Sequence, residues 1–435
     1  MNQIDKNAGS LNHKRTNDLF YAALISILII RICSYFMLSE EVVITQTLKV
    51  VMRITTALWV LLISGNYARH QKTNINFDYT LSPLLYITYL MLGVASLYWT
   101  SSFNDSILHL LMDAETLFFS YIYIRLISKR NANNPDNPIR LSRIIAISIF
   151  LISTVFVIGM IVMPEKFYRF THGGEEARLG GFIINPNELG MLIAIGIATT
   201  FIELKFSFNK IFKWTMMALL LYALVLTGSR SSLAGLFIIM IFFASQSKTA
   251  RMRALIIAFM VLASPYVFLQ LFIKQGNMEE VMNMTGRIPF WKDLLCFNFP
   301  KEPFLGYGYM RIDYSDKFES FSSYAGAMTH NTFLQVLMGL GLVGFFIIIC
   351  QMSATIHAIS ASNDIQKKRL SIALFIPVII NSFTEFGIFG ETNYGIMFYL
   401  FIVFSLSLKP VGSFIRIEPT NATERNPVFR PSVVT

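Results

Sequence analysis

Residues 144–163 read IIAISIFLISTVFVIGMIVM, twenty residues without a charged side chain. A segment of about 20 mostly apolar residues is long enough to cross the hydrocarbon core of a bilayer as an α-helix. Similar stretches recur along the whole chain of 435 residues, which is 54% hydrophobic and 14% charged. A typical soluble domain is less apolar and carries about 25% charged residues. The composition therefore predicts an all-α, polytopic membrane protein.

Hydropathy places twelve membrane spans along the chain. They are expected at residues 18–38, 43–65, 79–98, 105–128, 144–163, 182–202, 212–227, 231–247, 254–273, 331–355, 370–388 and 395–408. The sequence GSRSS alone separates the seventh and eighth spans, which predicts a tight hairpin, because one segment of their combined length would overshoot a bilayer. The spans delimit an N-terminal segment (1–17), a transmembrane domain (18–408) and a polar tail (409–435) that we expect to be disordered.

The distribution of lysine and arginine predicts how the chain is oriented. With the N-terminus in the cytoplasm, the cytoplasmic segments and the span ends next to them carry 23 of the 36 basic residues, and the short outer loops carry 4. Short cytoplasmic loops of membrane proteins carry an excess of these two residues. We therefore expect both termini in the cytoplasm. One long outer loop, at about residues 274–329, then joins the ninth span to the tenth.

Three function classes fit the sequence poorly. The net charge of +10 does not indicate nucleic-acid binding, because the basic residues are spread over many short loops. Three cysteines at wide spacing form neither a disulfide framework nor a metal-binding motif. The two halves of the chain show no repeat, which weakens a transporter interpretation, since many transporter folds are built from such repeats.

Polar residues stand where the sixth predicted span begins. Arg178 lies just before it, and Asn185, Pro186, Asn187 and Glu188 follow. An asparagine cap with proline in the first helical turn explains Asn185 and Pro186. It leaves the next two residues unexplained, although polar side chains at this depth are costly unless they face a cavity or one another.

Three further residues share the predicted outer face. Arg230 is at the tip of the GSRSS hairpin, Arg287 is in TGRIPFW in the long loop, and His330 heads the tenth span in AGAMTHNTFLQ. Each has an ordinary explanation alone: contact with lipid headgroups, a solvated surface, or a helix cap. Together with Arg178 they indicate a site, because guanidinium groups bind phosphate oxygens and histidine accepts a proton near neutral pH.

Acidic residues extend this pattern. Glu385 lies at the outer end of the eleventh span and Glu391 in the loop beyond it, while Asn331 follows the histidine as a candidate cap. No carboxylate pair on this face has the spacing of metal ligands, so we expect no metal. Asp113 and Glu115 lie deeper, within the fourth span. They are either functional or paired internally, and this choice stays open. The candidate partners are Arg31, Lys49 and Arg53.

Four segments in this order resemble the O-antigen ligase and Wzy-type polymerase superfamily. They are ARLGGFIINPNELG (177–190), LTGSRSSLAG (226–235), TGRIPFWKDLL with PFLGYGYM (285–310) and THNTFLQVLMGLGLVGF (329–345). The resemblance covers roughly residues 90 to 400 and rests on the ordered set, since each fragment alone is weakly specific.

The resemblance implies a metal-independent, inverting glycosyltransferase of the bacterial inner membrane that needs no cofactor. Its donor would be an oligosaccharide linked to undecaprenyl diphosphate, used on the periplasmic face. A polymerase transfers the glycan to a lipid-linked repeat unit, and a ligase transfers it to lipid A-core. The motifs at 285–310 favour the polymerase, with the ligase as the alternative. Membrane lipids, a chain-length regulator and a flippase are the expected partners.

The chemistry of this transfer fits the candidate residues. A leaving diphosphate needs positive charge, and an acceptor hydroxyl must lose its proton as it attacks. At positions that match the family, diphosphate binding falls to Arg178, Arg230 and Arg287, and His330 becomes the general base. The supporting residues are Glu385, Asn187 and Asn331. A lipid-linked glycan flippase and a membrane scaffold are the rival functions, and both fit less well because the arginines lie at the outer ends of spans.

Overall fold

We describe the fold from a computed structural model. The described residues are 2–69, 74–171, 176–204, 209–247, 249–268, 286–309, 312, 318, 328–390 and 392–410. Glu391, residues 411–435 of the polar tail and much of the predicted long loop lie outside them. The expected disorder of the tail therefore stays a prediction.

Twelve helices of 14 residues or more make up most of the described chain, and each overlaps one predicted span. They are α1 (Asn2–Cys33), α2 (Val42–Arg69), α3 (Leu81–Ser96), α4 (Phe103–Asn133), α5 (Leu141–Val162), α7 (Pro186–Glu203), α8 (Lys210–Thr227), α9 (Arg230–Ser245), α10 (Ala250–Phe268), α13 (Thr332–Ala361), α14 (Ile365–Ser382) and α15 (Tyr394–Ser407). Two residues join α8 to α9, so the hairpin predicted at GSRSS is confirmed. The first helix begins before residue 18 and includes the polar N-terminal segment.

Five of the described helices are long and apolar enough to cross a membrane: α4, α5, α8, α13 and, over Val42–Tyr67, α2. The apolar helices α3, α9 and α15 are shorter. The chain is therefore a helical, multi-pass membrane protein. Twelve crossings and the cytoplasmic position of both termini remain predictions.

Two small antiparallel sheets depart from the predicted all-α class. The hairpin of β2 (Tyr168–Thr171) and β3 (Glu176–Leu179) precedes α7, and β1 (Ile75–Phe77) pairs with the distant β4 (Leu408–Pro410). Strands of three or four residues are too short for an alternating hydrophobic pattern to stand out. These strands were therefore not predicted.

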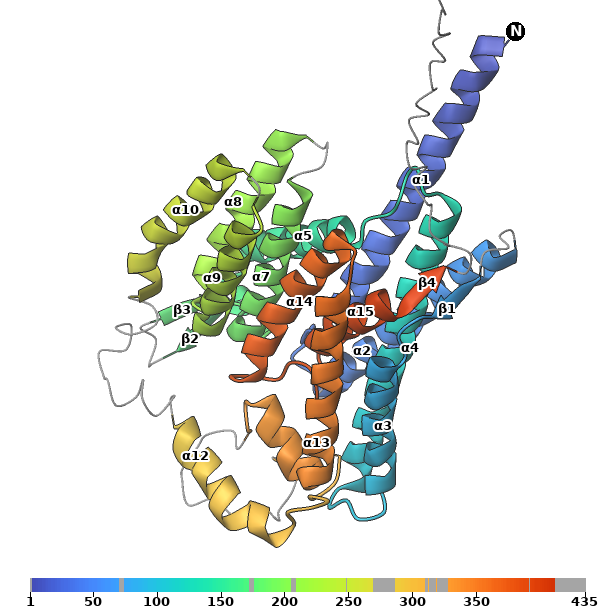
Figure 1. The fold of residues 1–435 in the computed structure, drawn as a ribbon. Helices are drawn as coiled ribbons and strands as arrows, with labels where there is room; N and C mark the ends of the chain where they lie inside the picture. The colour runs from blue at the N-terminus through green and yellow to red at the C-terminus, as the bar shows by residue number, and fades with distance from the viewer. Residues whose placement is uncertain are drawn as a thin grey trace, which may run out of the picture.

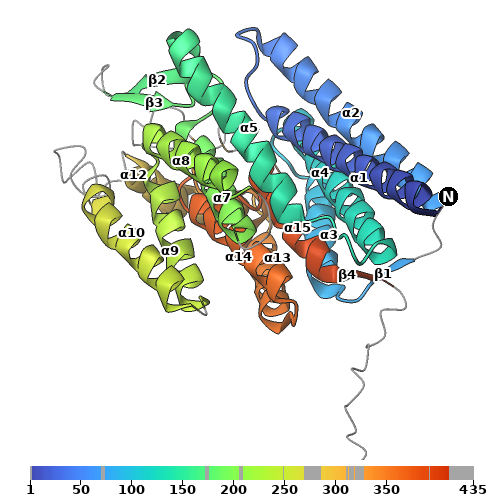
Figure 2. The same cartoon turned by 90° about the horizontal axis from the view of Figure 1, so that it is seen from above.

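The helices form a layered bundle in which α7 and α15 lie deepest. Almost every side chain of these two helices is buried. Figure 2 shows α1 and α2 along one edge and α10 at the opposite edge, with α7, α14 and α15 between them. Exposed valine, leucine and isoleucine side chains cover α2, as expected for a helix that faces lipid. The short helix α12 (Arg287–Asp293) lies at the end of the molecule opposite the N-terminus (Figure 1).

The long helix α13 is broken at Gly341, whose backbone angles (φ 61°, ψ −161°) are not helical. Segment 303–308, which contains PFLGYG, fills the break. Four backbone hydrogen bonds join the two: Tyr307 N–H to Met338 O (3.0 Å), Gly308 N–H to Gly339 O (2.8 Å), Leu342 N–H to Pro303 O (2.9 Å) and Val343 N–H to Phe304 O (3.2 Å). Backbone groups freed inside a membrane protein need such partners. Part of the predicted outer loop is therefore built into the helix bundle.

The acidic residues of α4 have separate partners. Both oxygens of Glu115 accept hydrogen bonds at 2.6 Å from the guanidinium of Arg31, which is fully buried. Internal pairing of Glu115 is thus confirmed, and it joins α1 to α4. Asp113 is also buried, but it accepts hydrogen bonds from the hydroxyls of Tyr309 and Thr392.

Substitution of Gly341 tests the close contact between segment 303–308 and α13. A Cβ at this position would lie 2.3 Å from the carbonyl of Phe304, in a backbone conformation that side chains rarely adopt. We expect Gly341→Ala to lower the free energy of unfolding by about 1–3 kcal/mol. Gly65→Ala is the matched control, because a Cβ there meets nothing within 4 Å. Thermal unfolding of both purified variants measures the difference, and equal midpoints would contradict the contact.

Candidate functional site

The start of α7 directs Asn187 into the site. The side chain of Asn185 accepts a hydrogen bond at 2.9 Å from the backbone amide of Asn187, and Pro186 occupies the first helical position. This is the cap predicted from the sequence. One turn on, a Cβ at Gly190 would lie 2.6 Å from Ser229, so the absence of a side chain lets α7 approach the start of α9.

Arg178 lies on β3 and reaches the end of α8 and the start of α7. Its Nε donates to the carbonyl of Thr227 at 2.8 Å, and its Nη2 donates to Oδ1 of Asn187 at 2.7 Å. The turn after β3 requires glycine, because Gly181 has a φ of 61° and its Cβ would lie 2.2 Å from the Lys166 carbonyl. The hairpin thus brings Arg178 against the start of α7.

Arg287 is the first residue of α12 and points toward the connection between α14 and α15. Its Nη2 donates to Oε1 of Glu385 at 3.0 Å, and its Nη1 donates to the carbonyl of Thr384. Within the TGRIPFW segment, residues from Arg287 onward form the short helix α12. The contact of Arg287 with the carbonyl of Thr384 was not predicted, because a backbone acceptor has no signature in the sequence.

His330 is the one non-glycine residue of the described chain with a positive φ, at 43°. Such strained residues persist where the surroundings hold them, and they cluster at functional sites. On one side, Nε1 of Trp291 donates to the carbonyl of Thr329 at 2.6 Å. On the other, the side chain of Asn331 accepts from the backbone amides of Phe333 and Leu334 in the first turn of α13 at 3.0 Å. Asn331 is therefore the helix cap that the sequence suggested, and it holds the histidine in place.

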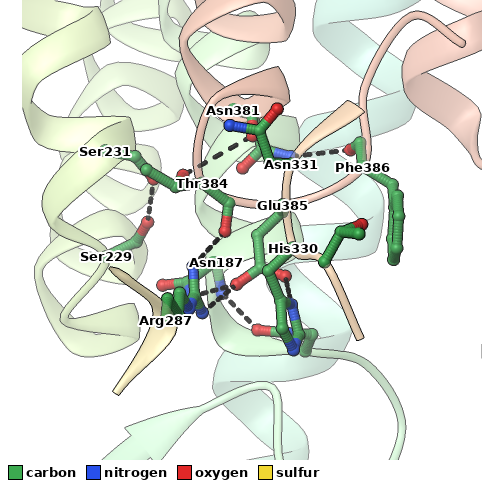
Figure 3. A network of polar contacts seen from close by, with 12 residues as sticks. Asn187, Ser229, Ser231, Arg287, His330, Asn331, Asn381, Thr384, Glu385 and Phe386 are labelled. Atoms are coloured by element: carbon green, nitrogen blue, oxygen red, sulfur yellow. Dashed lines mark hydrogen bonds and ion pairs between the residues drawn. The ribbon is translucent and has the colours of Figure 1, made fainter. Parts of the chain in front are cut away.

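Glu385 joins these parts, as Figure 3 shows. Its Oε1 accepts from Nδ2 of Asn187 at 2.8 Å and from Arg287, and its Oε2 lies 2.5 Å from Nδ1 of His330. Only 2% of the residue is exposed. The predicted eleventh span ran to residue 388, whereas α14 ends at Ser382. Glu385 therefore lies in the connection beyond the helix, where it is free to face three other segments.

The environment favours the ionised form of the Glu385 carboxyl. Burial by itself raises the pKa of a carboxyl. Here the hydrogen bond and charge of His330, the charge of Arg287 and the hydrogen bond from Asn187 outweigh burial, and they hold the pKa below its ordinary value of 4.5. An ionised carboxylate only accepts hydrogen bonds, so the short contact places the histidine proton on Nδ1. When the histidine is neutral, its lone pair is therefore on Nε2, as in a histidine oriented to act as a base.

Arg230 lies beside this network but is not part of it. It is the first residue of α9, partly exposed, and no hydrogen bond or ion pair of Arg230 occurs among the described residues. The neighbouring Ser232 donates to the backbone carbonyl of Asn187 at 3.3 Å, which places the start of α9 next to the network. The guanidinium of Arg230 is therefore open to an anion.

Most of the predicted site residues thus meet in space. Five form one chain of contacts: Arg178, Asn187, Glu385, Arg287 and His330. Glu391, suggested from the sequence, lies outside the described residues. Within the described ranges, no three histidine, cysteine, aspartate or glutamate side chains gather as metal ligands would. The contact of Trp291 was not predicted, although its position in TGRIPFW, one helical turn after Arg287, indicated that the two side chains share a helix face.

Glu385→Gln tests the network through pH. Because the folded-state pKa lies below 4.5, the stabilisation from the carboxylate is complete above about pH 4.5 and is lost as pH falls through the folded-state pKa. We expect the purified wild type to unfold at a higher temperature than Glu385→Gln at pH 7, with the gap shrinking below pH 4.5. A gap that is absent at pH 7, or that widens in acid, would contradict this electrostatic account.

Part of the chain is similar to a known protein family. Residues 215–349 match the model of the O-antigen ligase family, a stretch that begins within α8 and ends within α13. It contains Arg230, Arg287 and His330, whereas Arg178 and Glu385 lie outside it. No curated protein matches the chain. The match at residues 215–349 therefore confirms the resemblance to the O-antigen ligase and Wzy-type polymerase superfamily.

Proposed function

We propose that this protein is an inner-membrane glycosyltransferase that moves a glycan from undecaprenyl diphosphate to a sugar hydroxyl on the periplasmic face. The contact between Nδ1 of His330 and Glu385, in one network with Arg287 and beside Arg230, carries the proposal. The family match supports a glycosyl-transferring enzyme that acts on lipid-linked polysaccharide. The site lies toward the α12 end, away from the N-terminus, which agrees with the predicted orientation (Figure 1).

In the proposed reaction, His330 is the general base. The acceptor hydroxyl attacks the anomeric carbon of the donor sugar, and its proton passes to Nε2 of His330. A new carbon–oxygen bond forms as the bond from that carbon to the diphosphate breaks, with inversion at the anomeric carbon. Glu385 stabilises the imidazolium that results, since its carboxylate already accepts from Nδ1. Proton transfer of this kind contributes about 10²–10⁴-fold to rate.

The arginines divide the remaining work. Arg230 offers its whole fork of donors, and Arg287 keeps N–H groups beyond the two that bind Thr384 and Glu385. We propose that both stabilise the charge that develops on the leaving diphosphate, which requires no metal. Two donors of Arg178 bind the protein itself. Its proposed share in diphosphate binding is therefore smaller, and it mainly positions Asn187.

The acceptor decides between two activities of the same site. The loop motifs at 285–310 support a polymerase that extends a lipid-linked repeat unit. The printed description of the matching family supports the alternative, a ligase that transfers the glycan to lipid A-core. We propose the polymerase as the first function to test. A lipid-linked glycan flippase is less well supported, because the described network occupies one end of the helices.

His330→Ala tests the proposed base. We expect transfer to fall at least 100-fold in a reconstituted assay with a lipid-linked oligosaccharide, because alanine cannot take the proton of the acceptor hydroxyl. His357→Ala is the matched control, since His357 is exposed near the other end of α13. A thermal unfolding midpoint close to that of the wild type shows that the variant folds. Wild-type transfer by His330→Ala would remove the histidine from the mechanism.

Deletion of the gene separates the two activities. Loss of a polymerase leaves single repeat units on the lipid core, because ligation continues without extension. Loss of a ligase leaves long chains on undecaprenyl diphosphate. We expect the first pattern on gels of extracted glycolipid. The second pattern would replace the polymerase by the ligase, and an unchanged glycan profile would contradict both.

A further inference from the structure

We infer that Asp113 is a positioning residue for the proposed site. It would fix segment 301–309 and the connection at 383–393 relative to each other, and with them Arg287 and Glu385. The kinetic part of this inference rests on the proposed function, and its structural part does not.

Asp113 occupies a special place in α4. It is fully buried, and its two oxygens accept hydrogen bonds from two different chain segments. Oδ1 accepts from the hydroxyl of Thr392 at 2.6 Å, and Oδ2 accepts from the hydroxyl of Tyr309. Burying a carboxyl within a membrane protein costs desolvation free energy, so such residues generally have a structural or catalytic role. Glu115, two residues on, differs because it pairs with two arginines, Arg31 on α1 and Arg53 on α2.

Thr392 ends the connection in which Glu385 lies. Two backbone amides of this connection are also held: Gly387 N–H donates to the hydroxyl of Thr332 at 2.9 Å, and Gly390 N–H donates to Tyr89 at 3.2 Å. Thr332 is the first residue of α13, two residues after the histidine. The hydrogen bond to Asp113 therefore anchors the far end of the connection, and Glu385 occupies its near end.

Tyr309 ends the segment that continues from α12. Its amide donates to the hydroxyl of Ser96 at 3.0 Å, and its ring lies 5.6 Å from that of Tyr89. Two short helical turns, Leu294–Asn298 and Phe299–Lys301, link this segment back to α12, which begins with Arg287. The second hydrogen bond of Asp113 thus anchors the chain that carries the arginine.

These contacts connect the two segments at two separate places. The ion pair between Arg287 and Glu385 joins the two segments at the site, and Asp113 joins them a second time through Tyr309 and Thr392. If Asp113 loses either contact, one segment can shift while the other stays. A misplacement of about 1 Å in an active site can cost about 100-fold in rate. Asp113 therefore acts through position, without touching the substrate.

Thr392→Val with Thr392→Ser as its matched control tests the inference. Valine has nearly the shape of threonine but no hydroxyl for Asp113, whereas serine keeps the hydroxyl. Spin labels at the exposed positions Lys292 on α12 and Phe383 after α14 report the distance between the two segments. The background carries substitutions of the three free cysteines, Cys33, Cys296 and Cys350. We expect a broader distance distribution in Thr392→Val and an unchanged one in Thr392→Ser.

The kinetic arm uses the same variants without labels in the reconstituted transfer assay. We expect kcat to fall at least tenfold in Thr392→Val while KM for the lipid-linked donor changes less than about threefold, because binding survives a loss of alignment. Thr392→Ser should restore kcat. A purely structural role would instead reduce the amount of folded protein and leave kcat per folded molecule unchanged.

Each outcome decides something. A distance distribution in Thr392→Val as sharp as in the wild type would overturn the inference, whatever the activity. A broadened distribution with unchanged kcat per folded molecule would overturn the link from Asp113 to catalysis. A broadened distribution in a protein whose wild type transfers no glycan would refute the proposed function and leave the positioning role standing.

Discussion

The buried carboxylate of Glu385 is the contact on which the site depends. Its oxygens accept from Asn187 on α7, from Arg287 on α12 and from His330 at the start of α13. A buried ionised carboxyl is costly unless hydrogen bonds and opposite charge compensate it. Three segments that are far apart in the sequence must therefore converge on it. Compensation of the buried charge also orients the histidine, because Nδ1 of His330 is held against the Glu385 carboxylate.

The membrane domain also depends on a part of the chain that is not a span. Segment 303–308 inserts its backbone into the break of α13 at Gly341, and the hydrogen bonds freed by the break are replaced by bonds to the inserted segment. The helix carrying Arg287 is thereby tied to the helix headed by His330. Such insertion is favourable only where every freed backbone group finds a partner. The inserted segment thus serves both helix packing and the arrangement of the site.

Much of this arrangement could be predicted from residue types, and the rest depended on contacts that leave no sequence pattern. Counts of basic residues placed Arg178, Arg230, Arg287 and His330 on one face, and the structure joins three of them through Asn187 and Glu385. The separate position of Arg230 could not be foreseen, since spacing does not show which arginines the protein itself binds. Hydropathy could not locate the short strands or the end of α14 before Glu385, because its boundaries are uncertain by a few residues.

The most direct test of the account is a cryo-electron microscopy structure of the protein with a lipid-linked oligosaccharide donor bound in a nanodisc. The account predicts diphosphate oxygens within hydrogen-bond distance of Arg230 and Arg287. It also predicts that Nε2 of His330 faces the anomeric carbon of the donor sugar while Nδ1 stays on Glu385. A diphosphate bound at the other end of the helices, or a histidine turned away from the sugar, would contradict it.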